Sequence, residues 1–380
     1  MSRADSMSPA YRRGQGEALM HLVMLPGDGI GPEISHATRR VLEVVDRALA
    51  LGLTFEEHEI GLSRLARDGS TFPEAVLERC RASDGVILGP VSHSDYPPRE
   101  KGGINGSALL RRELDLYANI RPCRSREGLA YYGRTPIDLV IVRENTEGFY
   151  ADRTMHMGTG EFMPTPDVAI AMRKVTAKGS ERIARAAFEI ARTRRRRKLT
   201  YVHKVNVLKM SDALFLKEGR RVAESYPDIA TDDQLIDSMT AMLVRDAARF
   251  DVIVTTNMFG DILSDLASEL SGSLGLGAAI NAGDQHCVAQ AQHGSAPDIQ
   301  GQDKANPCSL VLSAAMLLDW LADRLDRPDL RRGAAAIDAA VDHLVKDPAT
   351  RTRDLGGLLG TQAFAETLCK EVESRLRHTR

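Results

Sequence analysis

Short apolar segments rich in β-branched residues alternate along the chain with longer segments of helical periodicity. The apolar segments have the length and composition of buried strands, and they lie at residues 21–25, 85–88, 138–142, 199–202 and 251–255. Helical patterns lie between them, at residues 32–50, 180–191, 210–225 and 237–248. This alternation is typical of an α/β protein whose helices cover a largely parallel sheet. We therefore expect an α/β fold.

Length and charge narrow the choice further. The 380 residues exceed what one hydrophobic core usually serves, so we expect two domains or one large one. A formal net charge of -2 gives no general attraction to nucleic acid or to an anionic membrane, and no apolar segment is long enough to span a bilayer. Residues 1–19 lack the apolar run of a secretion signal, and we expect a flexible tail. The five scattered cysteines suit a reducing compartment, so we expect a cytoplasmic location.

Two aspartates follow the strand predicted at residues 251–255. Asp261 and Asp265 are four residues apart, so on a helix they share one face and repel each other unless a cation lies between them. Phe259 and Ile262 interleave with them, which argues against a merely solvated acidic face. Carboxylate oxygens are the ligands that Mg²⁺ and Mn²⁺ prefer. The pattern therefore predicts a divalent metal site.

Basic residues stand beside apolar, strand-like segments. Arg121 and Arg143 border apolar segments, and arginine binds carboxylates as a bidentate donor. Together they suggest a substrate with more than one carboxylate, although each could instead be an ion-pair partner of Glu144 or Glu147. Lys204 ends another strand, where it could shuttle a proton or simply face solvent.

Polar segments directly follow the predicted strands, at residues 143–147, at 203–206 and from 257 onward. In open parallel sheets, ligands bind at the carboxyl ends of the strands. We therefore expect these segments to converge on one cleft.

Two loops have the composition of ligand-binding loops. Residues 25–33, LPGDGIGPE, lack the spacing of a dinucleotide fingerprint, and a structural turn and a ligand loop both remain open. The loop at 293–307 is rich in small residues and could wrap a flat cofactor. In that loop, Asp298 could accept hydrogen bonds from a ribose diol and repel a 2′-phosphate.

Taken together, LPGDGIGPE, DLYANIRP, RENTEGFY, HKVNVL, NMFGDILSD and HGSAPDIQGQDKANP resemble the β-decarboxylating hydroxyacid dehydrogenases, which act on isocitrate, homoisocitrate, 3-isopropylmalate or tartrate. The resemblance runs from His21 to the C-terminal helices. It implies a two-domain α/β fold, not a Rossmann fold, with a mixed sheet flanked by helices. Residues 20–116 and 272–380 would form the cofactor-side domain, and residues 117–271 the domain for dimerisation and the metal. The active site would lie between the domains and be shared between the subunits of a homodimer.

The resemblance also assigns roles to individual residues. It implies that the substrate is bound by Asn105, Ser107, Arg111, Arg121 and Arg143. Tyr150 and Lys204 would be the acid and base, and Asp261 and Asp265 would hold Mg²⁺ or Mn²⁺ with the catalytic Asp237 of the partner subunit. The adenosine half of the cofactor would contact His293, Gly294, Ser295, Ala296, Pro297, Asp298 and Asn306. Relatives that use NADP typically carry Lys-Tyr where this chain has Asp298-Ile299, so we expect NAD.

The implied function is the NAD- and metal-dependent oxidative decarboxylation of a small hydroxy di- or tricarboxylate, a 3-substituted malate. Isopropylmalate enzymes typically have a glutamate and two leucines where this chain has Ile104, Ser107 and Ala108, and isocitrate enzymes have Ser-x-Asn where it has Asn105-Gly-Ser107. Gln290 replaces the usual glutamate. A tartrate- or malate-type activity stays open, as does a non-catalytic regulatory subunit. The retained arginines, lysine and aspartates argue against the latter.

Overall fold

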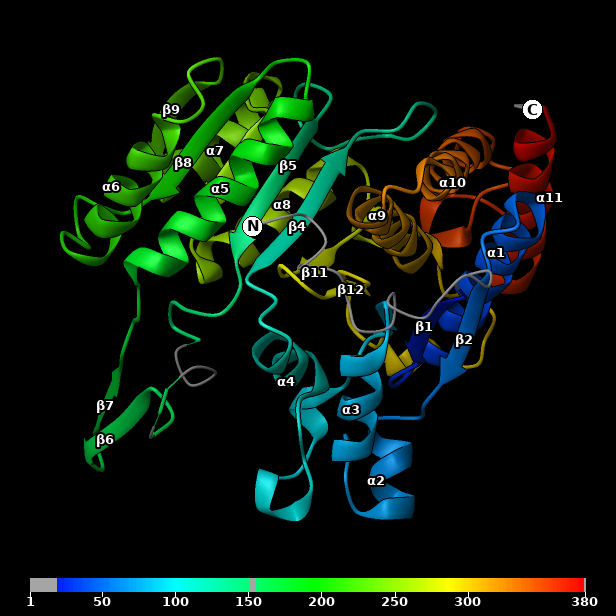
Figure 1. Cartoon of the computed structure of the whole chain (residues 1–380), viewed down its shortest axis with the longest axis horizontal. Helices are drawn as coiled ribbons and strands as arrows, with labels where there is room; N and C mark the ends of the chain where they lie inside the picture. Colours follow the sequence, from blue (N-terminus) through cyan, green and yellow to red (C-terminus); the bar gives the residue numbers. More distant parts are fainter. Residues whose placement is uncertain (1–18, 151–154, 157, 379–380) are drawn as a thin grey trace.

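The computed structural model describes residues 19–150, 155–156 and 158–378, so almost all of the predicted tail lies outside the described residues. The main strands are β1 (Met20–Leu25), β2 (Leu53–Glu57), β3 (Gly85–Leu88), β4 (Ala118–Arg124), β5 (Asp138–Glu144), β8 (Lys198–His203), β9 (Ala230–Leu235), β10 (Val252–Thr255), β11 (Ile280–Ala282) and β12 (Cys287–Gln290). They form one 10-stranded sheet in the order β2-β1-β3-β12-β11-β4-β5-β10-β8-β9 (Figure 1). The pairs β11–β12, β4–β11 and β4–β5 are antiparallel and the other pairs are parallel. The predicted α/β fold with a mixed sheet is confirmed.

Helices cover both faces of this sheet. They are α1 (Gly31–Leu49), α2 (Leu62–Asp68), α3 (Glu74–Ala82), α4 (Gly106–Glu113), α5 (Ala177–Thr193), α6 (Ser211–Ala223), α7 (Ile236–Asp246), α8 (Asn257–Ser271), α9 (Cys308–Leu325), α10 (Pro328–Lys346) and α11 (Thr361–His378). Among the described residues, none of these helices is both long and apolar enough to cross a membrane.

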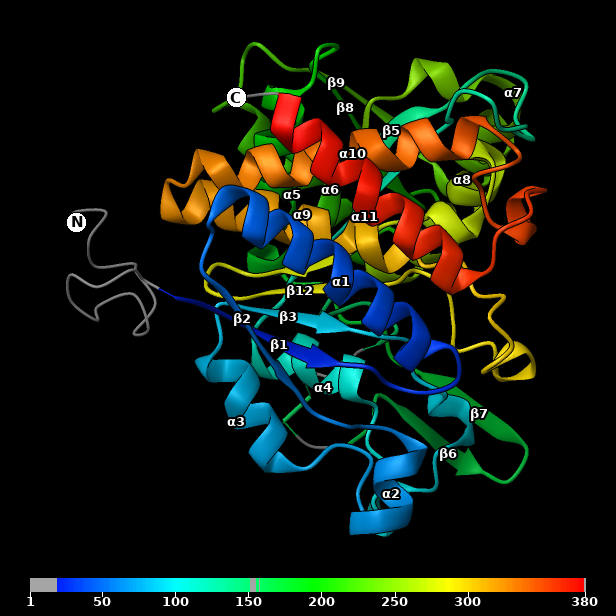
Figure 2. The same cartoon turned by 90° about the vertical axis from the view of Figure 1, so that its right-hand side faces the viewer.

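The alternation of side chains along each strand divides them between two cores. In β1, Leu22 and Met24 pack with α1, α9, α10 and α11, which lie together on one side of the sheet (Figure 2). Val23 and Leu25 pack with α3 and α4 on the other side. Alternate residues of β5 are divided in the same way between the α5–α6 face and the α7–α8 face. Burial on both faces explains why the sequence shows continuous apolar segments instead of alternating ones.

The sheet is continuous across the two predicted domains. Residues 20–116 and 272–380 contribute β1, β2, β3, β11 and β12, and residues 117–271 contribute the other strands. The pairing of β4 with β11 joins the two groups. A separate antiparallel hairpin, β6 (Glu161–Thr165) and β7 (Val168–Ala171), stands out from the body (Figure 1). The exact division into two domains stays a prediction.

Candidate active site

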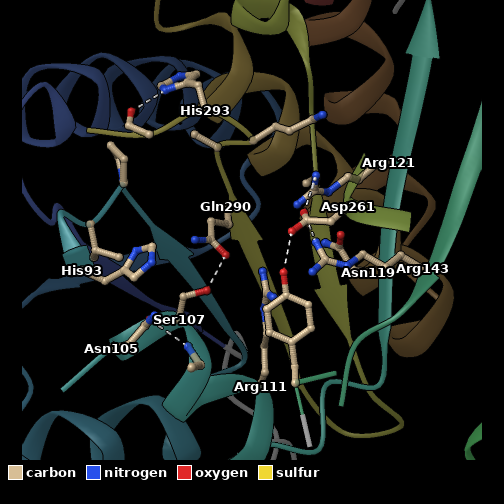
Figure 3. A pocket seen from close by; sticks show the side chains of 18 residues that line it. His93, Asn105, Ser107, Arg111, Asn119, Arg121, Arg143, Asp261, Gln290 and His293 are labelled. Carbon is tan, nitrogen blue, oxygen red and sulfur yellow. Dashed lines mark hydrogen bonds and ion pairs between the residues drawn. The ribbon is translucent and has the colours of Figure 1, made fainter. Parts of the chain in front are cut away.

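A pocket of about 350 Å³ lies beside the carboxyl ends of β3, β5 and β12 (Figure 3). Its walls come from the loop after β3, from α4, β4, β5, the first turns of α8, and the segment at 290–294. Of the residues that the sequence assigned to a site, it brings together Asn105, Ser107, Arg111, Arg121, Arg143, Tyr150, Asp261, His293 and Gly294. Residues far apart in the chain thus converge on one cleft, as the ends of parallel strands predict.

The arginines of this pocket are buried. Arg143 is only 1% exposed, and its Nε and Nη2 donate to Asn257 Oδ1 at 3.0 and 2.7 Å. Its Nη1 forms an ion pair with Asp261, so an ion-pair role is seen, but the suggested partners Glu144 and Glu147 are wrong. Burial and the neighbouring charge of Arg143 lower the pKa of Arg121 to about 10, so Arg121 remains charged near neutral pH. The pocket therefore has a strongly cationic wall.

Arginine charges offset the repulsion between the two aspartates of α8. Arg121 Nη1 lies 3.5 Å from Asp261 Oδ1 and 3.1 Å from Asp265 Oδ1. Burial opposes the ionisation of Asp261, but the charges of Arg143, Arg121 and Arg111 and a hydrogen bond from Tyr150 outweigh it and hold its pKa below the ordinary value. Asp261 is therefore a carboxylate beside the pocket at neutral pH, which is the form that a metal ligand requires.

Tyr150 joins the same group. Its hydroxyl donates to Asp261 Oδ2 at 3.1 Å, and the guanidinium of Arg143 lies 5.7 Å from the centre of its ring. The phenol therefore stands between the cationic wall and the acidic helix. Tyrosine in this position can give a proton to a group bound in the pocket.

Lys204 and Asp237 form a separate pair. Lys204 Nζ lies 2.5 Å from Asp237 Oδ1, and this hydrogen bond lowers the pKa of Asp237. Neither residue lines the pocket. The expected convergence of Lys204 on the same cleft is thus not seen within one chain. In the described part of the chain, no group of three or more His, Cys, Asp or Glu side chains is arranged to hold a metal ion.

The loop after β12 rests on the glycine-rich turn between β1 and α1. Gly29 has a φ of 57°, and a Cβ there would lie 2.0 Å from the carbonyl oxygen of Ser295. Ile30 N–H donates to that oxygen at 2.9 Å, and the hydroxyls of Ser295 and Ser92 are 2.7 Å apart. The glycine therefore permits close packing of the turn against the predicted cofactor loop.

The other predicted cofactor residues lie farther along the same loop. Burial lowers the pKa of His293, which keeps this side chain neutral at pH 7. Ala296 and the short 3₁₀ turn η8 (Pro297–Ile299) carry Asp298 on the surface. Asn306 donates to Asp354 at 2.9 Å and accepts the backbone N–H of Cys308. Among these cofactor residues, only His293 and Gly294 line the pocket.

Several pocket residues were missed by the sequence reasoning. These are His93, Asn119 and Gln292. Asn257 does not line the pocket, but its side-chain oxygen accepts two hydrogen bonds from Arg143 and orients it. The position of Asn257 was expected, because it begins the polar segment that follows the strand predicted at residues 251–255. Asn119 could not have been found, because it lies inside a strand and its amide donates at 3.1 Å to Asn281, a residue distant in sequence.

Comparison with known proteins places the chain in a family. A family profile described as isocitrate/isopropylmalate dehydrogenase matches residues 21–372. An isocitrate/homoisocitrate dehydrogenase of Thermus thermophilus is 42% identical over 93% of this chain and 98% of its own length. A 3-isopropylmalate dehydrogenase of Archaeoglobus fulgidus is 39% identical over 93% of this chain and 99% of its own length.

A solved structure agrees with these sequence relatives. The isocitrate dehydrogenase from Methylococcus capsulatus superimposes with a TM-score of 0.82 at 38% identity, over 93% of this chain and 100% of that one. The resemblance recognised in the sequence motifs is thereby confirmed. The chain belongs to the isocitrate/isopropylmalate dehydrogenase family, and it is an oxidoreductase that acts on the CH–OH group of a hydroxy acid.

Proposed function

We propose that this protein catalyses the NAD- and Mg²⁺- or Mn²⁺-dependent oxidative decarboxylation of a 3-substituted malate to a 2-oxo acid, CO₂ and NADH. The observation that carries the proposal is the charge of the pocket. The lining of the pocket contains three arginines, Arg111, Arg121 and Arg143, and one acidic residue, Asp261. Buried arginines bind carboxylates as bidentate donors, so this excess of positive charge suits a substrate with several carboxylates.

In the proposed reaction, a hydride leaves C2 for NAD while the proton of the C2 hydroxyl passes to Lys204 of the partner subunit. The resulting β-keto acid loses the carboxylate on C3 as CO₂. The electron pair of the broken C–C bond remains as an enolate, which Tyr150 protonates at C3. Arg121 and Arg143 orient the substrate carboxylates, because their own positions are fixed by Ser264 and Asn257.

The residues available fit a hard divalent cation. Asp261 and Asp265 present carboxylate oxygens on one face of α8 beside the pocket, and Asp237 of the partner subunit would add a third ligand. A bound Mg²⁺ or Mn²⁺ would acidify the C2 hydroxyl and stabilise the enolate charge. We therefore propose a homodimer whose metal sites lie at the junction of the two subunits.

The side chains on α4 and β12 favour a substrate whose C3 substituent carries a carboxylate. Asn281 Oδ1 accepts hydrogen bonds from two neighbouring asparagines, so its Nδ2 must donate to Gln290 Oε1, at 3.1 Å. Ser107 donates to the same oxygen at 3.0 Å, which leaves the amide NH₂ of Gln290 for the pocket (Figure 3). Asn105 likewise uses its oxygen to cap α4. Amide N–H groups pair with an oxygen acceptor but not with an alkyl group.

The test is NADH formation from isocitrate, homoisocitrate, 3-isopropylmalate, tartrate and malate in the presence of Mn²⁺. We expect the highest kcat/KM with isocitrate or homoisocitrate. A higher value with isopropylmalate would contradict the proposed polar subsite, and turnover of none of them would contradict the proposed function.

Gln290→Glu tests the subsite by a near-isosteric change. The carboxylate would keep both accepted hydrogen bonds but would place a negative charge where the NH₂ group now lies. We expect the ratio of kcat/KM for isocitrate to that for isopropylmalate to fall by about tenfold or more, since facing like charges repel. An unchanged ratio would exclude Gln290 from substrate selection.

A further inference from the structure

Arg173 belongs to the segment between β7 and α5. This segment joins the β6–β7 hairpin to the body (Figure 1). Its side chain is buried, with 7% of its surface exposed, and Arg173 does not line the pocket. The guanidinium contacts separate parts of the chain: Nη1 lies 2.5 Å from Asp212 Oδ1 and donates to Ser211 Oγ at 2.7 Å, and Nη2 donates to Thr256 Oγ1 at 3.0 Å. A buried cation with such distant partners fixes their relative positions.

The first of these partners holds Lys204. Asp212 is completely buried, and its second carboxylate oxygen accepts the backbone N–H of Lys204 at 2.6 Å. The carbonyl of Lys204 in turn accepts the N–H groups of Val207 and Leu208 at 2.9 and 2.8 Å. Because a buried carboxylate without a cation is strongly unfavourable, Arg173 is the group that permits Asp212 to hold this loop.

The other partner, Thr256, lies at the start of α8, the helix that carries Asp261 and Asp265. Thr256 precedes α8, and its carbonyl accepts the N–H of Gly260 at 2.9 Å in the first turn. The guanidinium of Arg173 also lies 5.6 Å from the ring centre of Phe259, in that same turn. Asp261 is two residues farther along. Arg173 therefore links the backbone of Lys204 to the first turn of α8.

We infer that Arg173 is a positioning residue, which holds the Lys204 loop and the start of α8 in one fixed arrangement. It acts through Asp212 and Thr256 and touches neither substrate nor cofactor. The inference rests on the proposed roles of Lys204 and Asp261. It predicts that loss of the guanidinium displaces Lys204 and slows the chemical step, while the binding of NAD, on the other side of the pocket, is retained.

The chain offers a matched control at the amino-terminal end of β10, whereas Thr256 follows the carboxyl-terminal end of the same strand. Arg194 contacts Asp251, which is 1% exposed and immediately precedes β10. This is also a buried aspartate with an arginine partner, but it lies at the amino end of the strand, away from the pocket. Arg194→Met thus reports the cost of breaking such a pair without displacing Lys204.

The experiment compares Arg173→Met, Arg173→Lys and Arg194→Met in steady-state kinetics and in amide hydrogen exchange. We expect Arg173→Met to lower kcat roughly 10- to 100-fold with little change in KM for NAD, as expected for a misplaced catalytic group. Arg173→Lys should recover part of kcat, and guanidinium ion should partly rescue Arg173→Met. Exchange at residues 204–208 should accelerate in Arg173→Met but not in Arg194→Met.

Wild-type kcat in Arg173→Met, or equal losses of kcat in Arg173→Met and Arg194→Met, would overturn the inference. So would unchanged exchange at residues 204–208, which needs no assay of activity. Absence of turnover by the wild-type protein on every hydroxy acid would instead contradict the proposed function, and the exchange measurement would still report whether Arg173 holds the loop. If Arg173→Met does not fold, Arg173→Lys carries both measurements.

Discussion

Lys204 and Asp237 form an ion pair of 2.5 Å within one chain, and neither side chain lines the pocket where Arg143 meets Asp261. The proposed base and one proposed metal ligand are therefore separated from the other half of the proposed site. The separation follows the order of the strands, because β8 lies beyond β10 from β5. We propose that a second copy of the chain brings the two halves together.

Subunit mixing tests this requirement. Lys204→Met and Asp261→Asn should each be inactive as pure proteins. When the two chains are expressed together, we expect about a quarter of wild-type activity, because half of the randomly assembled dimers are hybrids and each hybrid regains one complete site. If hybrids are detected by mass spectrometry and activity stays absent, Lys204 does not act in the partner's site.

Removing either aspartate of α8 should weaken metal binding. For Asp265→Asn we expect the concentration of Mn²⁺ needed for half-maximal rate to rise at least about tenfold, and for the inactive Asp261→Asn we expect the dissociation constant of Mn²⁺ to rise by a similar factor, since each loses an anionic oxygen ligand. Free Mn²⁺ measured by electron paramagnetic resonance should show the same loss. Glu269→Gln is the control, because Glu269 lies on the same helix and its carboxylate accepts the backbone N–H of Leu274. Equal Mn²⁺ affinity in all variants would refute the assignment.

The exposed Asp298 should determine which nicotinamide cofactor is used. A carboxylate accepts hydrogen bonds from the ribose diol of NAD and repels the 2′-phosphate of NADP. We expect the double change Asp298→Lys and Ile299→Tyr to shift the ratio of kcat/KM for NADP to that for NAD upward by more than about tenfold. Asp323→Lys, the same change of charge on α9, should leave the ratio unaltered. A wild-type preference for NADP would show that Asp298 has another role.

Gly260 should be intolerant of even one added carbon. A Cβ there would lie 2.5 Å from Cγ and 2.6 Å from Cβ of Arg143. Gly260→Ala should therefore lower the free energy of unfolding by about 1–3 kcal/mol and raise KM for the substrate, because Arg143 must move. Urea unfolding and initial rates measure the two effects. Gly133→Ala is the control, because its Cβ would meet its nearest neighbour at 3.3 Å, and it should change neither the stability nor KM. A wild-type KM in Gly260→Ala would refute the role of Arg143 in binding the substrate.

The elements that could be predicted are those whose own residues determine them. The apolar segments at 85–88 and 251–255 match β3 and β10 because both faces of these strands are buried. Strands β4, of seven residues, and β11, of three, were not predicted. They carry the buried Asn119 and Asn281, and Asn281 Oδ1 accepts hydrogen bonds from the side-chain amides of Asn119 and Asn145, which are distant in sequence.

The candidate active site could likewise be predicted only in part from the sequence. The spacing of Asp261 and Asp265 indicated a shared helix face, and the ends of parallel strands indicated that Arg143 lies nearby. The sequence could not show that Arg121 contacts both aspartates, because these contacts join residues 140 and 144 positions apart. Nor could it place Lys204, because its distance from the pocket depends on the order of strands in the sheet.

Metal-dependent oxidative decarboxylation is tested most directly by measuring CO₂ and NADH in the same reaction. With the best substrate, NAD and Mn²⁺, we expect equimolar CO₂ and NADH, the loss of both on chelation, and the return of both when Mn²⁺ is restored. Formation of NADH without CO₂, or turnover that survives removal of the metal, would contradict the proposed reaction.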